Sequence, residues 1–326
     1  MAQSSLSFKR ELKGYLKITM KITTKTGLMI RVPIQAQAFK IGGADQYPIT
    51  TSRKYLINNE EIELEVPYIP GSSLKGRVRS LLEIAYGETL YTTDQKIWQH
   101  VRGTRLMNSK DFYDDVVKRC PIDDLFGWAA ANYEQIKEHL KDYLIKTDNP
   151  EQKLKDLFSN LAPTRLLFDD FYPSKETVEK LKARSIADFL EEKSENRIDR
   201  ITSAAEPRTF PRVKPGVEFE GTVTMLIFDI DKDHLKKYLE TFANGLKLVE
   251  DTYLGSSGSR GYGRVGFEDI VIELFKINKT QSGVSVVKQP TIAKLSNLED
   301  LRSKLDKIAE NITSKLFSED SKHSGT

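Results

Sequence analysis

The sequence has very few of the residues that build disulfide frameworks and metal centres. Its 326 residues include one cysteine, Cys120, and four histidines. A single cysteine excludes an internal disulfide, and histidines scattered along the chain make a Cys/His zinc site improbable. We therefore expect the protein to work in a reducing compartment, the cytoplasm.

The sequence also lacks long apolar runs and an excess of one charge. No stretch approaches the roughly 18 apolar residues of a membrane span, and residues 1–14 lack the apolar centre of an export signal. We expect no membrane partner. The 50 Lys+Arg residues face 47 Asp+Glu, which leaves a net charge of only +3. Any phosphate-binding surface must therefore be local.

What the chain does have is enough apolar residues, 39%, to form a packed core. Apolar residues alternate at 12–23 and 217–230, and shorter apolar runs occupy 165–168 and 267–277, which predicts four strands. The spacing at 70–87 and 233–249 predicts two amphipathic helices. This order is the α+β pattern of a ferredoxin-like, or RRM-like, β-α-β-β-α-β core.

The remaining segments predict insertions into this core. The acidic pairs at 114–115 and 123–124 fall within one of these insertions, and we expect them to lie on the surface or at helix caps. Residues 174–192 and 295–316 predict further helices. The expected units are 12–87, the first half of the core with a long loop at 24–69; 88–160, a helical inserted lobe; 161–171, a core strand; 172–216, an inserted region with an extended basic arm; 217–277, the second half of the core with a Gly-rich loop; and 278–326, a charged helix and polar tail.

The first basic element is the segment 70–79, PGSSLKGRVR. Its two serines stand at a predicted helix start, where one would be the N-cap and where free N–H groups and the helix dipole favour an anion. An ordinary capped helix with a solvated basic face is the alternative. A Walker A loop is excluded by the spacing. The residues that would hold phosphate are Ser72, Ser73, Lys75, Arg77 and Arg79.

The second basic element is the loop at 255–266, GSSGSRGYGRVG, which has five glycines in twelve residues. Glycine lets the backbone approach a phosphate closely, and an aromatic ring among arginines suits stacking on an unpaired base. A tight helix-to-strand connection is the alternative. A dinucleotide site is disfavoured because the loop precedes a strand. The residues expected to contact RNA here are Arg260, Tyr262 and Arg264.

The third basic element is the arm at 197–214, in which arginines alternate with apolar residues and prolines. An arm that reaches out to a nucleic-acid backbone has this composition, although a solvated loop does too. Three local basic elements in a nearly neutral chain together predict RNA binding along the backbone. The arm residues expected to contact RNA are Arg197, Arg200, Arg208 and Arg212.

These motifs, in this order, resemble the RAMP superfamily of CRISPR proteins. The likeness is strongest to the repeated backbone subunit of type III (Csm-like) effector complexes. It implies as partners a CRISPR guide RNA, a complementary target RNA, copies of the chain stacked head to tail, and the large, small and end-capping subunits of such a complex. The matching segments are TGL at 26–28, PGSSLKGR at 70–77, LFG at 125–127, RLLFDD at 165–170, RIDR at 197–200 with PR at 207–208, and the Gly-rich loop.

The resemblance also implies an activity. Region 172–216 looks like the family's thumb, which inserts into the guide–target duplex. In cleaving members an aspartate after the first strand cuts target RNA with a divalent metal, and Asp45 in IGGADQYPI (41–49) looks like that residue. The implied protein is a metal-dependent endoribonuclease, with Asp45 as catalytic residue and ligand of Mg²⁺ or another divalent ion. Asp170, in contrast, is expected to have a structural hydrogen-bonding role.

Two other functions stay open at this point. The chain could be a scaffold paralogue that binds guide RNA without cutting the target. It could also mature the CRISPR transcript by metal-independent acid–base chemistry, which commonly needs a histidine. None of the four histidines lies near the Gly-rich loop or the loop after the first strand in the sequence, and Met29 follows TGL where family members usually have His.

Overall fold

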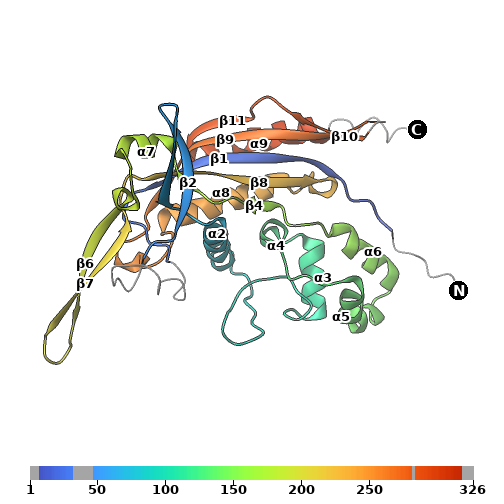
Figure 1. Ribbon diagram of the computed structural model, residues 1–326. Coiled ribbons are helices and arrows are strands. Elements are labelled where there is room, and N and C mark those ends of the chain that lie inside the picture. Colours follow the sequence, from blue (N-terminus) through green and yellow to red (C-terminus); the bar gives the residue numbers. More distant parts are fainter. Residues whose placement is uncertain (1–6, 32–46, 281–282, 318–326) are drawn as a thin grey trace.

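The computed structural model describes residues 7–31, 47–280 and 283–317, and its centre is one seven-stranded sheet (Figure 1). β1 (Leu12–Thr24) lies between β8 (Glu218–Phe228) and β9 (Val265–Thr280) and is antiparallel to both. The other strands are at the edges: β4 (Leu166–Phe168) and β5 (Tyr172–Pro173) pair with β8, and β10 (Gly283–Lys288) and β11 (Ala293–Asn297) pair with β9.

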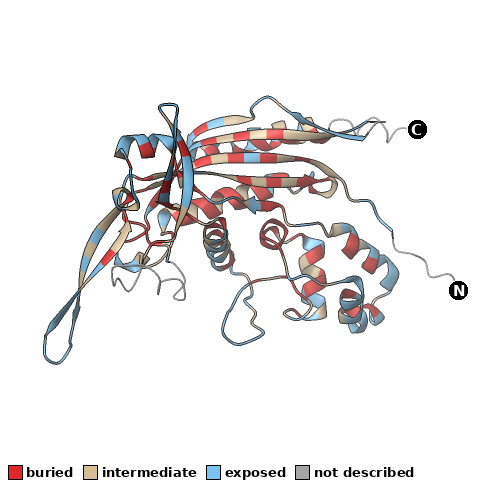
Figure 2. Cartoon of the chain, viewed as in Figure 1, coloured by how far each residue is buried: buried red, intermediate tan, exposed pale blue. Residues whose placement is uncertain are grey.

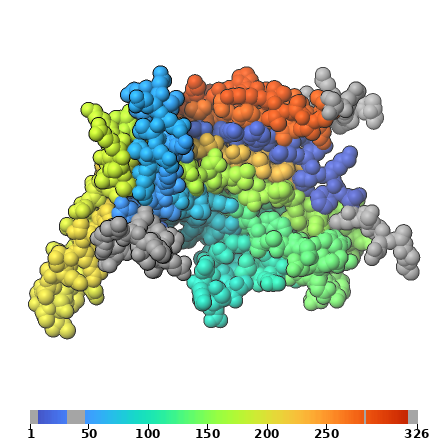
Figure 3. Space-filling model, in the orientation of Figure 1, coloured from blue at the N-terminus to red at the C-terminus, as the bar shows by residue number. Residues whose placement is uncertain are grey.

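Helices cover one face of this sheet, while Figure 3 shows the opposite face, with β1 visible between β8 and β9. The alternating apolar residues of β1, among them Leu16, Ile18 and Met20, are buried in one core with residues of α2 (Gly71–Ala85), α8 (Leu235–Asp251) and α9 (Leu298–Phe317). Gly245 lets α8 approach α2 closely, since a Cβ there would lie 2.5 Å from the Val78 side chain.

The α+β fold class predicted from the sequence is confirmed. The four strands and two helices expected for the core are all present in the predicted chain order. Their order in the sheet, β9-β1-β8-β4, is compatible with the split β-α-β core. The edge strands β10 and β11 were not predicted. All six side chains of β10 are exposed, so its sequence lacks the alternation that marks a half-buried strand.

The inserted lobe has its own small core. The lobe comprises α3 (Ser109–Lys118), α4 (Pro121–Phe126), α5 (Tyr133–Ile145) and α6 (Pro150–Asn160). Phe112, Val116, Leu140 and Leu157 form its centre, separate from the main core. In Figure 1 these helices lie together below the sheet.

Two hairpins stand at the opposite end of the molecule from the lobe (Figure 1). One consists of β2 (Thr50–Ile57) and β3 (Glu60–Pro67). The other, which follows α7 (Lys175–Leu181), consists of β6 (Leu190–Ile198) and β7 (Ala205–Val213) and projects from the body. Figure 2 shows that its outer half is exposed. The basic arm is thus a β-hairpin, and the helix expected over 174–192 ends at Leu181.

The helix before the arm ends early because Lys182 adopts a left-handed backbone conformation (φ 48°), as is common just past a helix C-terminus. The arm itself carries polar side chains on both faces, which hides its strand periodicity in the sequence. No helix among the described residues is long and apolar enough to cross a bilayer.

Candidate nucleic-acid interface

The Gly-rich loop and the arm meet at the segment that follows β1. On one side of this segment Gly27 O accepts a hydrogen bond from Gly263 N (2.9 Å), and on the other Leu28 N donates to Val213 O at the base of β7 (2.9 Å). Met29 O then accepts a bond from Ser256 N (2.8 Å). Motifs more than 180 residues apart in the sequence therefore form one continuous surface.

The glycines of the loop are needed by the loop itself. Gly263 has a φ of +74°, and a Cβ there would lie 2.0 Å from Leu254 O. This close approach allows Leu254 N to donate to Gly263 O (2.8 Å), which closes the loop. Gly255 (φ +81°) likewise needs a left-handed conformation, beside Met29 O. The glycines thus build the tight connection that was the alternative to direct contact with phosphate.

Arg77 joins α2 to the start of this loop. Its Nε donates to Tyr253 O (3.0 Å), and its guanidinium lies over the Tyr253 ring, 4.1 Å from the centroid. Gly258 packs against the same ring, since a Cβ at Gly258 would lie within 2.1–2.3 Å of ring atoms. This role of Tyr253 could not be predicted, because a lone aromatic residue between a helix and a loop follows no periodic pattern. All three basic elements therefore converge.

Arg264 binds the C-terminus of α8. Its guanidinium donates to Asp251 O (2.8 Å) and to Thr252 O, which places a positive charge at the negative end of the helix. Its backbone N donates to Thr26 Oγ1 (3.0 Å). The side chain is nevertheless exposed, so one side remains open to a ligand.

Tyr262 cannot stack on a base, contrary to expectation, because its side chain is buried (2% exposed). Lys193 and Arg212 of the arm lie over its ring, 4.4 and 4.6 Å from the centroid. Burial, together with a hydrogen bond to Glu195 and the charge of Glu195, raises the pKa of Tyr262 to about 12. The ring packs the arm against the loop, and its hydroxyl stays neutral.

The arm carries exposed arginines beside the loop. A hollow of about 810 Å³ lies along it, lined by Arg197, Arg200, Arg208 and Arg260. Glu206 lies 2.9 Å from Arg208 and 3.9 Å from Arg197. Exposed pairs of this kind are weak and can exchange for phosphate. Arg212, in contrast, is bound by Glu191 (2.7 Å) and is mostly buried.

The arm ends in a tight turn. The Asp199 carboxylate accepts hydrogen bonds from the backbone N of Ile201 and of Thr202 (2.8 Å each). Those bonds to Thr202 and Ile201 lower the pKa of Asp199. The turn presents Ile201, which is 94% exposed, at the tip of the hairpin.

The start of α2 differs from the predicted anion cradle. The helix begins at Gly71, whose N donates to Asp170 Oδ1 (2.7 Å), and neither Ser72 nor Ser73 is the N-cap. A Cβ at Gly71 would lie 2.5 Å from Phe168 O, so only glycine fits at this helix start. The structural role expected for Asp170 is confirmed: its carboxylate provides the negative charge at the helix N-terminus.

Lys75 and Arg79, four residues apart on α2, have different surroundings. Lys75 is half-buried, and burial, followed by the charge of Arg79, lowers its pKa. The Arg79 guanidinium points into the protein, where it bonds Glu83 (2.7 Å), Asp123 (2.8 Å) and Gly127 O (2.8 Å). Arg79 therefore joins α2 to the lobe and does not face a surface that RNA could reach.

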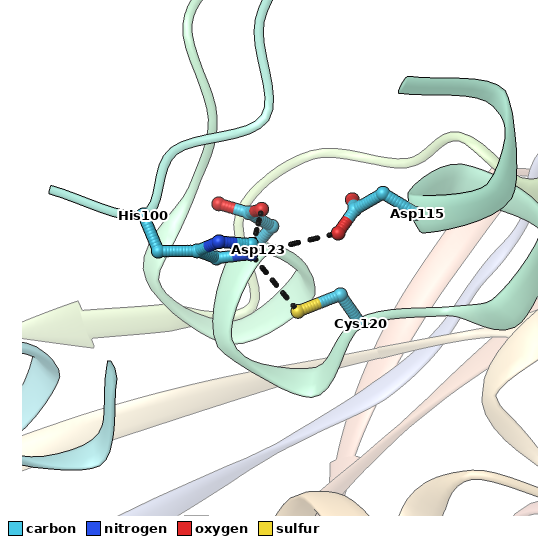
Figure 4. Close-up of side chains that lie close together, drawn as sticks. All are labelled: His100, Asp115, Cys120 and Asp123. Carbon is cyan, nitrogen blue, oxygen red and sulfur yellow. Dashed lines mark hydrogen bonds and ion pairs between the residues drawn. The ribbon is translucent and has the colours of Figure 1, made fainter. Parts of the chain in front are cut away.

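A buried polar cluster lies behind Arg79 and is drawn in Figure 4. One ligand atom from each of four side chains, His100, Asp115, Cys120 and Asp123, lies within 4.8 Å of the others. The expectation that Asp115 and Asp123 are surface residues is wrong, because Asp123 is fully buried and Asp115 nearly so. Burial disfavours the charged form of His100, but hydrogen bonds to Asp115, Asp123 and Cys120 outweigh it and raise its pKa.

This cluster does not fit Mg²⁺. Magnesium prefers six oxygen ligands, several of them waters, whereas the cluster offers one nitrogen, one sulfur and two carboxylates in a closed site. Arg79 and Arg102 already bond those carboxylates, at 2.8 and 2.5 Å. The described residues contain no other group of three or more metal-ligating side chains.

Asp45 lies outside the described residues. Arg31 and Pro48, which flank 32–46, form an isolated β-bridge, and Arg31 Nε donates to Ser256 Oγ (3.2 Å) in the Gly-rich loop. Both flanking residues therefore lie at the interface. Met29, where the family usually has His, has a buried side chain.

Comparison with known proteins identifies the family. The family model described as "RAMP superfamily" matches residues 21–266. The protein "CRISPR system Cms endoribonuclease Csm3" of Methanothermobacter thermautotrophicus is 34% identical over 272 residues, covering 80% of this chain and 86% of that protein. The chain belongs to the RAMP superfamily and, within it, to the Csm3 family.

Other Csm3 proteins show the same extent of similarity. The Csm3 of Methanocaldococcus jannaschii is 31% identical over 300 residues, covering 91% of this chain and 95% of that protein. Among solved structures, Csm3 of Methanopyrus kandleri is similar with a TM-score of 0.49 and 20% identity, covering 92% of this chain and 98% of that one. In sequence, the similarity covers 86% and 95% of the two archaeal Csm3 proteins.

Proposed function

We propose that this Csm3-family chain is the guide-binding backbone subunit of a type III CRISPR effector complex and cleaves complementary target RNA at regular intervals. The convergence of α2, the Gly-rich loop and the arm on residues 26–31 carries this proposal. The naming of its relatives as CRISPR endoribonucleases supports it. The protein acts in the cytoplasm, where such RNA is made.

Guide RNA is held through its phosphates. The exposed side of the interface supplies cations and hydroxyls for this, whereas Arg77 and Arg212 hold the loop and the arm in place. Arg79 and Tyr262 do not contact the guide, because both side chains are directed inward. Phosphate contacts position RNA without reading its sequence, so affinity is independent of guide sequence. The contacting residues are Ser72, Ser73, Lys75, Arg197, Arg200, Arg208, Arg260 and Arg264.

The guide also organises the assembly. Copies of the chain stack head to tail along it through a heterologous contact, which continues until the end-capping subunits stop it. The large and small subunits of the complex complete it. The arm of each copy reaches across the guide–target duplex. Because the copies are identical, the same contact recurs at each interval, and this sets the spacing of the cuts.

Cleavage belongs to Asp45. Its carboxylate accepts the proton of a target 2′-hydroxyl, whose oxygen forms a bond to the adjacent phosphorus as the bond to the 5′-oxygen breaks, and the leaving 5′-oxygen takes a proton from water. The products are a 2′,3′-cyclic phosphate and a 5′-hydroxyl. A divalent ion such as Mg²⁺, when held by Asp45, supplies positive charge to the phosphate. Chemistry by the described histidines is disfavoured, because His100 and His139 lie in the lobe and His234 packs on Tyr238 of α8.

The test is an assembled complex that carries Asp45→Asn, incubated with complementary RNA and Mg²⁺. We expect cleavage to fall about 100-fold or more, with guide and target binding unchanged. Asp148→Asn, the same change at an exposed position of the lobe, is the control and leaves cleavage intact. Unchanged cleavage at every site in Asp45→Asn would remove Asp45 from the mechanism and favour the scaffold function.

A further inference from the structure

The arm projects from the body as a separate two-stranded sheet. Within the described part of the chain, β6 and β7 pair only with each other. The base is held by the bridge between Leu28 and Val213 and by Lys214 N, which donates to Phe189 O (3.0 Å). An isolated two-stranded ribbon is only marginally stable and bends easily. Contacts further along the hairpin must therefore fix its direction.

Those contacts come from one face of the hairpin, and besides β6 they include Arg212 of β7, which lies over the Tyr262 ring. Residues 191, 193 and 195 point the same way, because successive side chains of a strand alternate. This face lies on the Gly-rich loop. Lys193 Nζ donates to Arg260 O (2.8 Å), and Arg260 donates to Glu195 Oε2 (3.0 Å). These two bonds cross between hairpin and loop in opposite directions.

Glu195 balances the charge at this contact. Lys193, Arg212 and Arg260 all gather around the buried Tyr262 ring and the loop. Arg212 is paired with Glu191, while Lys193 and Arg260 share Glu195, at 3.5 and 3.0 Å. The Glu195 side chain is 18% exposed, so solvent screens these charges only in part. Without its carboxylate, two cations would face each other across the contact.

We infer that Glu195 is a positioning residue that sets the direction of the arm by tying it to the Gly-rich loop. Its place in the hairpin gives it leverage, because everything beyond it, from Asn196 to the tip, is exposed or lines the open hollow. β6 continues for three residues beyond Glu195, to Ile198, which is about 10 Å at the usual rise of a strand, and the turn extends further. A small change of angle at Glu195 therefore moves the tip by several ångströms.

The direct test measures where the tip points, without RNA. Spin labels are attached at Ile201→Cys in the tip and Ser303→Cys on α9, in a Cys120→Ser background. We expect one narrow distance distribution that broadens about twofold in Glu195→Gln. Glu192→Gln, the same change on the opposite, exposed face of β6, leaves it narrow. An unchanged width in Glu195→Gln would overturn the inference.

A second measurement covers the case in which Cys120→Ser disturbs its buried cluster. Amide hydrogen exchange in the otherwise native chain is compared between Glu195→Gln and Glu192→Gln. Exchange within 190–213 and 255–264 is faster in Glu195→Gln only, because the loop and the arm lose their shared contact. Equal exchange in the two variants would contradict the inference as firmly as an unchanged distance width.

The consequence for cleavage rests on the proposed function. In the assembled complex, Glu195→Gln binds guide RNA within about twofold of the unaltered chain, because it removes no cation. Target cleavage falls about tenfold, since a displaced arm misplaces the scissile phosphate. If the distance distribution to the tip broadens in Glu195→Gln but target cleavage stays unchanged, this consequence is wrong. If the unaltered complex cleaves no RNA at all, the proposed function fails while the spin-label result stands on its own.

Discussion

At the scale of single residues, a network of buried charges joins the lobe to the core. Arg119 bonds Asp124 of α4 and Asp231, which precedes α8, at 2.6 Å each. Arg165, beside β4, bonds the same Asp231 (3.0 Å). All four side chains are at most 2% exposed. This network, rather than packing alone, fixes the lobe on the sheet.

Removing one member of this network is expected to be costly. Asp124→Asn leaves buried guanidinium groups without their counter-charge, so the free energy of unfolding falls by about 3–5 kcal/mol, measured by urea denaturation. Asp114→Asn, which loses only solvent-screened pairs with Lys110 and Lys118, costs less than about 1 kcal/mol. Equal losses in the two variants would show that the network does not fix the lobe.

The same network predicts how stability depends on pH. Burial raises the pKa of Asp124, but the charges of Arg165, Arg102 and Arg119 outweigh it and hold that pKa below its ordinary value. Its contribution is therefore complete above the unfolded pKa of about 3.9 and is lost as the pH falls through the lower, folded value. Urea titrations between pH 6 and pH 3 should show this loss, and a shallower one in Asp124→Asn.

Single residues are also where prediction from sequence was weakest. Lys75, Arg77 and Arg79 share one helix, yet only the packing of the lobe against α2 turns Arg79 inward. From the sequence, Tyr262 was likewise expected to stack on a base, but in the structure the arm covers its ring. A guanidinium or an aromatic ring can bind a partner within the protein core or on the surface. Residue type alone therefore does not predict whether its partner is protein or RNA.

At the scale of elements, the Gly-rich loop depends on its backbone path. Gly263→Ala would place a Cβ 2.0 Å from Leu254 O at a φ of +74°, so we expect it to destabilise the loop and weaken RNA binding about tenfold or more. Gly76→Ala meets nothing within 4 Å in the middle of α2 and should stabilise the chain by about 0.5–1 kcal/mol. Thermal unfolding and filter binding of both variants check this.

Elements with a clear period were predicted well. β1, β8, α2 and α8 each bury one regular set of apolar side chains, and each was predicted within a few residues. The arm was not recognised as a hairpin, because both of its faces are polar beyond Glu195. Its strands pair through backbone hydrogen bonds, and such bonds leave no trace in the order of side chains.

At the scale of the whole molecule, a net charge of +3 means that local cations alone make RNA binding sensitive to salt. Replacing Arg197, Arg200 and Arg208 by Ala should lower affinity equally for RNAs of different sequence. The slope of log affinity against log salt should fall by about 2, at roughly 0.7 per phosphate contact. The measurement is fluorescence anisotropy at several salt concentrations.

The control for this measurement removes the same charge from another face. Arg302, Lys304 and Lys307 are exposed on α9, and replacing all three by Ala should leave the salt slope unchanged. If both triple variants lowered the slope equally, binding would follow total charge and the arm would have no special part in it.

The place of β1 in the sheet also bears on how the chain is made. β1 is synthesised first, yet it is the strand between β8 and β9: Leu16 lies opposite Met225 on one side and Leu274 on the other. Between the end of β1 and the start of β8, about 190 residues are translated before either neighbour of its apolar face exists. Such distant pairing slows folding and exposes strand edges meanwhile. During synthesis, β1 should therefore stay without its sheet neighbours until β8 and β9 have left the ribosome.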